Sequence, residues 1–165
     1  LTDVDVSEIE DMSCLFNGRE PVGDLSNWDV SSVKDMSSMF EDSQFTGDIS
    51  NWDVSNVKDM SSMFDGSQFN GDISEWDVSN VTDMRWMFEG SQFTGDISSW
   101  DVSNVNDMKE IFDGARFTRY QDLACWNIHP EARKDFKKLE PLIKRALLAD
   151  ESTEIEVVKE EDLSL

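Results

Sequence analysis

A unit of 24 residues recurs about five times over roughly the first 125 residues, and this repeat constrains the fold more than any other feature. One copy, residues 69–92, reads FNGDISEWDVSNVTDMRWMFEGSQ. Self-similarity at a period of about 20–50 residues is typical of solenoids, in which each unit buries its apolar edge against the next. Three residue types return at this interval: Trp28, Trp52, Trp76 and Trp100; Met12, Met36, Met60, Met84 and Met108; Phe16, Phe40, Phe64, Phe88 and Phe112.

Each copy contains two apolar periods, which predict two kinds of local structure. Phe69, Gly71 and Ile73 alternate with polar residues, a pattern typical of a strand with one buried face. A spacing of three and four follows, with Asn56 as N-cap and Gly66 as C-cap in one copy, and it favours a short helix. The apolar residues on that helix are Val57, Met60, Met63 and Phe64. The sequence therefore predicts an α/β repeat solenoid, with leucine-rich-repeat-like coils of short parallel strands and short helices.

The repeat register ends at Trp126, which comes 26 residues after Trp100. Pro130 then fits the first turn of a C-terminal capping helix, and we expect Pro141 to kink or split that helix. An acidic segment follows, for which we expect an extended or disordered chain. The predicted parts are the solenoid (1–126), the capping helix (127–149) and the acidic tail (150–165).

The chain is strongly acidic, with 14 Lys and Arg against 36 Asp and Glu and a formal net charge of −22. An acidic surface repels phosphates and anionic lipid headgroups, so we expect no nucleic-acid partner. No apolar run approaches the ~18 residues of a membrane span, so we expect no membrane insertion. The expected partner is a protein or another surface macromolecule.

The two ends of the repeat array carry further predictions. Leu1 aligns with Leu25 and Ile49, so the sequence starts inside a copy, and we expect another part of a larger protein or a neighbouring chain to cover the first coil. Cys14 and Cys125 lie at opposite ends of the array, too far apart to bridge, so we expect free thiols.

The repeat also carries a family resemblance. The phrase W-D-V-S-N-V-x-D-M-x-x-M-F, from Trp76 to Phe88, and F-x-G-D-I-S, from Phe93 to Ser98, resemble the BspA-like surface-protein repeats, a leucine-rich-repeat relative of the mycoplasma lipoprotein-associated type. The resemblance covers about residues 1–126 and implies binding or adhesion at a cell surface or outside the cell. Viral members make a virion the alternative location. The family assigns no functional residues.

Catalytic residues are scarce in this sequence. The one histidine, His129, stands directly before Pro130 and suits a turn or a helix cap better than a general base. The many Ser and Asp residues recur in every copy, which indicates architecture, since a catalytic constellation is normally built once. We therefore expect no enzyme activity and keep an enzyme only as a distant alternative.

Aspartates form three ladders along the repeat. Equivalent carboxylates would lie about 5 Å apart in adjacent coils and repel by roughly 1 kcal/mol in water, so something must offset the repulsion. We expect hydrogen bonds from backbone amides or exposure to solvent, and no cofactor, with calcium between coils as the alternative. The ladders are Asp29, Asp53, Asp77 and Asp101; Asp35, Asp59, Asp83 and Asp107; and Asp24, Asp48, Asp72 and Asp96.

The copies differ most at two neighbouring positions. Serine pairs occupy them in two copies, at 37–38 and 61–62, but Arg85 and Trp86 replace the pair in the next copy, and Lys109 and Glu110 in the one after. Tryptophan beside arginine is the composition of a binding hot spot. We therefore predict these four residues as a binding site on a non-catalytic interaction or adhesion module. The alternatives are a solitary exposed aromatic, or a structural component of a virion or cell-envelope layer that stacks through the open N-terminal end.

Overall fold

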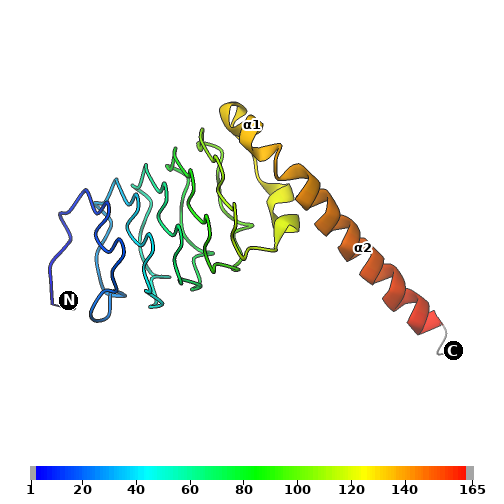
Figure 1. The fold of residues 1–165 in the computed structure, drawn as a ribbon, viewed down its shortest axis with the longest axis horizontal. Coiled ribbons are helices and arrows are strands. Elements are labelled where there is room, and N and C mark those ends of the chain that lie inside the picture. The colour runs from blue at the N-terminus through cyan, green and yellow to red at the C-terminus, as the bar shows by residue number, and fades with distance from the viewer. Residues whose placement is uncertain (1–2, 163–165) are drawn as a thin grey trace.

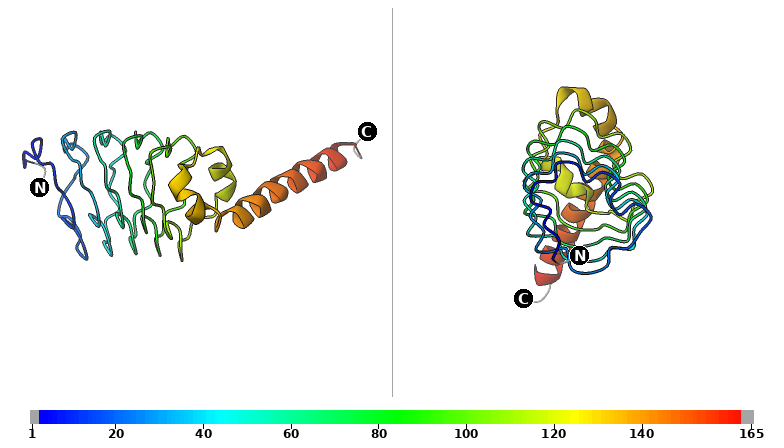
Figure 2. Two further views of the ribbon diagram at one scale, coloured as in Figure 1. Left: turned by 90° about the horizontal axis from the view of Figure 1, so that it is seen from above. Right: turned by 90° about the vertical axis from the view of Figure 1, so that its left-hand side faces the viewer.

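The computed structural model describes residues 3–162, with side chains through residue 151. The chain first winds into coils that lie side by side along one axis and then ends in a long helix that projects away from the stack (Figure 1). Viewed along the stack, successive coils superpose closely (Figure 2). The coils are joined by backbone hydrogen bonds between residues that are about one repeat apart, as from the Met36 amide to the Asp59 carbonyl, at 2.9 Å.

The predicted α/β solenoid of strands and helices is wrong. Over residues 3–119 the chain forms neither a helix nor a strand of more than one bridged residue. Instead, one position in each coil makes a single parallel bridge to the next coil. These isolated bridges are Asp11 to Asp35, Asp35 to Asp59, Asp59 to Asp83 and Asp83 to Asp107.

The segment predicted as a helix is a chain of turns that shares its hydrogen bonds with the next coil. The amides of Ser38 and Phe40 donate to carbonyls of the following coil at 2.9 and 3.0 Å, while the intervening Met39 amide bonds within its own coil, to Met36, at 3.2 Å. Alternate amides are therefore used between coils and cannot form the i to i−4 bonds of a helix. Ser62 and Gly66 take left-handed φ values of 54° and 62°, so Gly66 has the predicted conformation without capping a helix.

The segment predicted as a strand keeps its buried face but makes no ladder. Phe69 and Ile73 are buried, as the alternation predicts. Gly71 is needed because a Cβ there would lie 2.8 Å from the Phe69 ring of its own coil. The alternation therefore reflects packing of side chains inside the coil, and no pairing of strands across coils.

Aromatic ladders fill the interior of the stack. The indole of Trp52 is 4% exposed and its Nε1 donates to the Leu25 carbonyl of the preceding coil at 3.0 Å. Phe40, Phe64 and Phe88 stack at centroid distances of 5.8 Å. The predicted burial of the tryptophans in an internal ladder is confirmed. Trp126 extends it, because its Nε1 donates to the Ile97 carbonyl at 3.0 Å despite the shifted register.

The C-terminal part consists of four short or long helical elements that cover the last coil (Figure 1). In place of one capping helix over 127–149, the chain breaks before Pro141, which lies in the first turn of the last helix, where a missing N–H costs little. His129 caps the second element, since its Nδ1 accepts a hydrogen bond from the Glu131 amide at 3.2 Å. The elements are η1 (Tyr120–Cys125), η2 (Pro130–Ala132), α1 (Arg133–Phe136) and α2 (Glu140–Asp162).

Helix α2 also corrects the prediction for the acidic tail. The structure continues this helix to Asp162, through most of the segment for which we expected an extended or disordered chain. Residues 142–162 contain neither glycine nor proline and are rich in Glu, Leu and Lys, which favour helix. The last three residues of the predicted tail lie outside the described part of the chain.

Candidate functional site

The four predicted binding residues meet on two adjacent coils. The Arg85 guanidinium carbon lies 5.4 Å from the Trp86 ring centroid, and Lys109 Nζ lies 5.7 Å from it. Trp86 Nε1 donates to Glu110 Oε2 at 3.0 Å. The indole is thus flanked by two cations and anchored by one carboxylate. We call these four residues, Arg85, Trp86, Lys109 and Glu110, the Trp86 patch; their role in binding stays a prediction.

Trp86 occupies a backbone position that does not suit a bulky side chain. Its φ is 55°, in the left-handed region that large residues rarely adopt. The equivalent residues of the other coils have φ between 53° and 58°, so the geometry of the coil imposes this conformation. Those residues are Cys14, Ser38, Ser62 and Glu110. A half-buried tryptophan at this position is therefore not explained by the needs of the backbone.

Ion pairs fix the arginine of the patch. The Arg85 guanidinium contacts Asp83 Oδ2 at 2.7 Å and lies 3.8 Å from Asp107 Oδ2. The hydrogen bond from Asp83, and after it the charge of that carboxylate, hold the pKa of Arg85 above its ordinary value. Because these side chains are partly exposed, the pairs add little stability, but they orient the guanidinium beside the indole.

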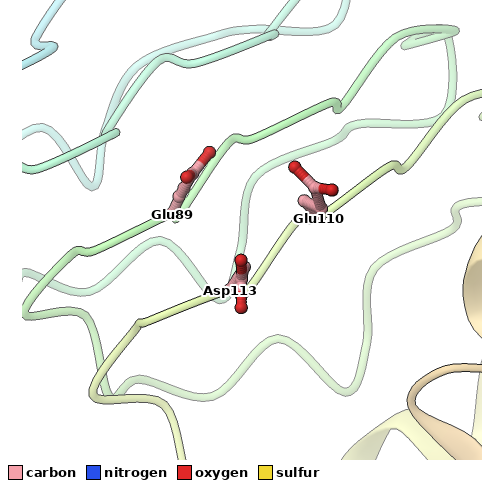
Figure 3. A group of neighbouring side chains, drawn as sticks. All are labelled: Glu89, Glu110 and Asp113. Carbon is pink, nitrogen blue, oxygen red and sulfur yellow. The ribbon is translucent and has the colours of Figure 1, made fainter.

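A column of carboxylates runs beside the patch and was missed by the sequence reasoning. Oxygens of Glu89, Glu110 and Asp113 lie within 4.8 Å of one another, with Glu89 on one coil and the other two on the next (Figure 3). Burial, and then the charges of Glu110 and Asp113, raise the pKa of Glu89. The signal was present in the sequence, since Glu41, Asp65, Glu89 and Asp113 recur at 24 residues, although Glu and Asp alternate there.

Asp65 in this column has the most perturbed carboxyl group that the structure resolves. Burial raises its pKa to about 6, and the charges of Glu89, Glu41 and Asp42 add to the shift. Partial burial without a cationic partner favours the neutral form of a carboxyl group. This part of the stack therefore takes up protons at mildly acidic pH.

The three aspartate ladders have the predicted structural role. In each ladder the carboxylate accepts a hydrogen bond from the backbone amide two residues later, as Asp53 does from Ser55 at 3.0 Å. At Asp77 the hydroxyl and amide of Ser79 together hold the pKa of the carboxyl group below its ordinary value. These bonds offset the repulsion between neighbouring coils. Calcium between the coils stays a prediction.

The fold and its repeated buried positions define the class: this is a repeat protein built from stacked 24-residue coils. The chain belongs to the family described as "Mycoplasma protein of unknown function, DUF285", whose model matches residues 1–90 and, in an overlapping match, 43–139. Neither the curated proteins nor the solved structures contain a match to the chain. In the described part of the chain, no helix has both the length and the apolar character needed to cross a membrane.

Proposed function

We propose that this chain is a non-catalytic protein-interaction or adhesion module of a cell-surface or extracellular protein, and that the Trp86 patch binds the partner. The observation that carries the proposal is the position of the patch: at 85 and 86 an exchangeable serine pair is replaced by arginine and tryptophan, while the buried residues of the coil are kept. Membership of a mycoplasma-type repeat family, and the resemblance to BspA-like surface repeats, support the location.

The patch has the properties of a preorganised hot spot. Its indole is held by the Glu110 carboxylate and by two cations, so binding would cost little side-chain entropy. Tryptophan and arginine are the residues most enriched among binding hot spots. Two cations on a chain of net charge −22 also favour a partner that presents carboxylates around an apolar contact.

The proposal that the chain is non-catalytic rests on residue chemistry. Nucleophilic catalysis by serine needs a base such as histidine, and the one histidine uses its Nδ1 to cap η2. The serines are hydrogen-bonded to aspartates in coil after coil, as Ser79 is to Asp77, which is an architectural use. Absence of an enzyme activity stays a prediction.

The test is a peptide library displayed on phage and selected against the full chain. The informative variant is Arg85→Ser with Trp86→Ser, because it restores the serine pair of residues 61–62 and should leave the fold intact. Lys144→Ser, an exposed position on α2, is the matched control. Selected peptides are expected to bind the wild type and the control equally and to lose about tenfold or more of their affinity for the double variant. Equal binding to all three proteins would contradict the proposal.

A second candidate function is a structural part of a larger assembly, such as a virion or cell-envelope layer. It is favoured by four large apolar side chains that are exposed near the first coil: Val4 (50%), Ile9 (39%), Leu15 (42%) and Val22 (80%). Sedimentation over a range of concentrations tests it. Ordered self-association that Leu15→Ser with Val22→Ser abolishes would support the assembly, and a monomer at every concentration would exclude self-assembly through this face.

A further inference from the structure

The last coil carries a row of backbone amides that lack acceptors. In the coil before it, the amides of Met84, Trp86 and Phe88 each donate to the following coil at 2.9 Å. No further coil follows the last one. Within residues 3–162, its equivalent amides have no hydrogen-bond acceptor: Met108, Glu110, Phe112 and Gly114.

A cavity of about 360 Å³ lies against this row. One wall is the last coil from Met108 to Ala115, and the other is formed by Tyr120 together with side chains of the C-terminal helices, among them Leu139 and Leu142. This volume falls within the range of ligand pockets, about 300–1,000 Å³. The helical cap therefore covers the end of the stack without filling the space that a further coil would occupy.

The opposite wall of the cavity contributes an unpaired acceptor. Asp135 lines the cavity, and its Oδ2 is buried without a hydrogen-bond partner in the described part of the chain. A buried carboxylate oxygen without a donor is costly, as is a buried amide without an acceptor. Glu110 and Asp113 line the same space with Lys138, so the lining is acidic overall.

These two sets of unpaired groups limit what can fill the cavity. A small anion would satisfy amides but would be repelled by three carboxylates, whereas a metal ion would satisfy carboxylates and leave the amides unpaired. A peptide offers carbonyl oxygens on alternate residues, as the following coil does elsewhere in the stack. A positive group on that peptide would pair with Asp135.

We propose that this cavity binds a short peptide segment that carries an ammonium group and adds itself to the stack as a partial further coil. Its carbonyls accept from the open amide row, and its ammonium group lies against Asp135. The ammonium group comes from a lysine side chain or from a free amino terminus. This site is separate from the function proposed for the Trp86 patch, although Glu110 borders both.

The experiment is a titration of the full chain followed by amide NMR and hydrogen exchange. One probe is acetyl-Ala-Lys-Ala-amide, and the other is Ala-Ala-Ala-amide with a free amino terminus. At saturation, the amides of the open row, at 108, 110, 112 and 114, are expected to shift and to exchange at least about tenfold more slowly. Their counterparts in the preceding coil should not change. Binding by one probe alone supports the site and identifies the source of the ammonium group.

Two variants test the site without touching the Trp86 patch. Asp135→Asn should weaken the charged peptides about tenfold, because it removes a charge-assisted hydrogen bond, while acetyl-Ala-Gln-Ala-amide should bind both proteins equally. Ala115→Trp should fill the cavity and block binding, whereas Ala124→Trp, an exposed position outside it, should not.

Three results would overturn the inference. The first is that neither charged probe shifts the open amides at ~10 mM, a concentration at which weak peptide sites fill. The second is that Asp135→Asn binds the charged probes as the wild type does. The third is that inorganic phosphate alone reproduces the shifts. None of these results depends on whether the Trp86 patch binds a partner, and loss of binding at the patch would leave this titration unchanged.

Discussion

Trp86 donates its indole N–H to Glu110 across two coils at 3.0 Å, and both residues occupy the same left-handed position of the repeat. In earlier coils this position holds a small residue, such as Ser38 or Ser62. The pair therefore replaces two small residues of one ladder with a tryptophan and its acceptor. The exposed side of the stack can change in this way because the backbone bonds between coils do not involve these side chains.

A double-mutant cycle measures this link. Trp86→Ser and Glu110→Ala are each expected to change the free energy of unfolding modestly, and their coupling energy should be about 1 kcal/mol in favour of the pair, the usual net contribution of one hydrogen bond. Chemical denaturation of the four proteins provides the values. A coupling energy near zero would mean that the indole does not depend on Glu110 for its orientation.

The raised pKa of Asp65 predicts a pH-dependent stability. The folded chain holds the proton up to a pKa of about 6, against 3.8 as the ordinary value, so the neutral form stabilises the fold at low pH and that contribution is lost as pH rises from about 4 through 6. Asp65→Asn should therefore raise the melting temperature at pH 8 and have little effect at pH 3.5.

Asp77→Ala is the opposite case to Asp65→Asn. Hydrogen bonds from Ser79 lower the pKa of Asp77, so its contribution is present above pH 4 and is lost as pH falls through the folded pKa. This variant should lower the melting temperature at pH 8 and do so less at pH 3. Thermal melts at the two pH values compare both variants with the wild type. Parallel pH profiles for all three proteins would contradict the assigned environments.

Trp52→Ala should be strongly destabilising. The side chain is 4% exposed, and its removal leaves a cavity and an unpaired Leu25 carbonyl, so a loss of about 3–5 kcal/mol is expected. Because each coil is stabilised by its neighbours, local melting around the vacancy should follow. Urea denaturation with Trp86→Ser as a control, expected within about 1 kcal/mol of the wild type, checks this. Similar losses for the two variants would show that the buried ladder is not the main source of stability.

The two cysteines should behave as accessible free thiols. Cys14 and Cys125 are both unbridged and exposed, so both should react with a thiol reagent in the native protein. Reducing agent should leave the melting temperature unchanged, because no disulfide constrains the unfolded chain. Fewer than two reactive thiols before denaturation would contradict this assignment.

Much of the interior followed from the sequence alone. The 24-residue period identified Trp52, Met60 and Phe64 as core residues, and all three are buried. The same comparison of copies singled out Arg85 and Trp86, which the structure brings together with Lys109 and Glu110. Burial and divergence are properties of single repeat positions, so they can be read from a chain that is aligned with itself.

Only the tertiary structure decided where the backbone hydrogen bonds go. An apolar spacing of three and four reports which side chains face inward, and a chain of turns satisfies it as well as a helix does. The amide of Ser38 bonds to the next coil because a neighbour at the right height is available, and that is a property of the stack. The open amides beside Asp135 likewise arise from how the cap packs on the last coil, which no local sequence pattern encodes.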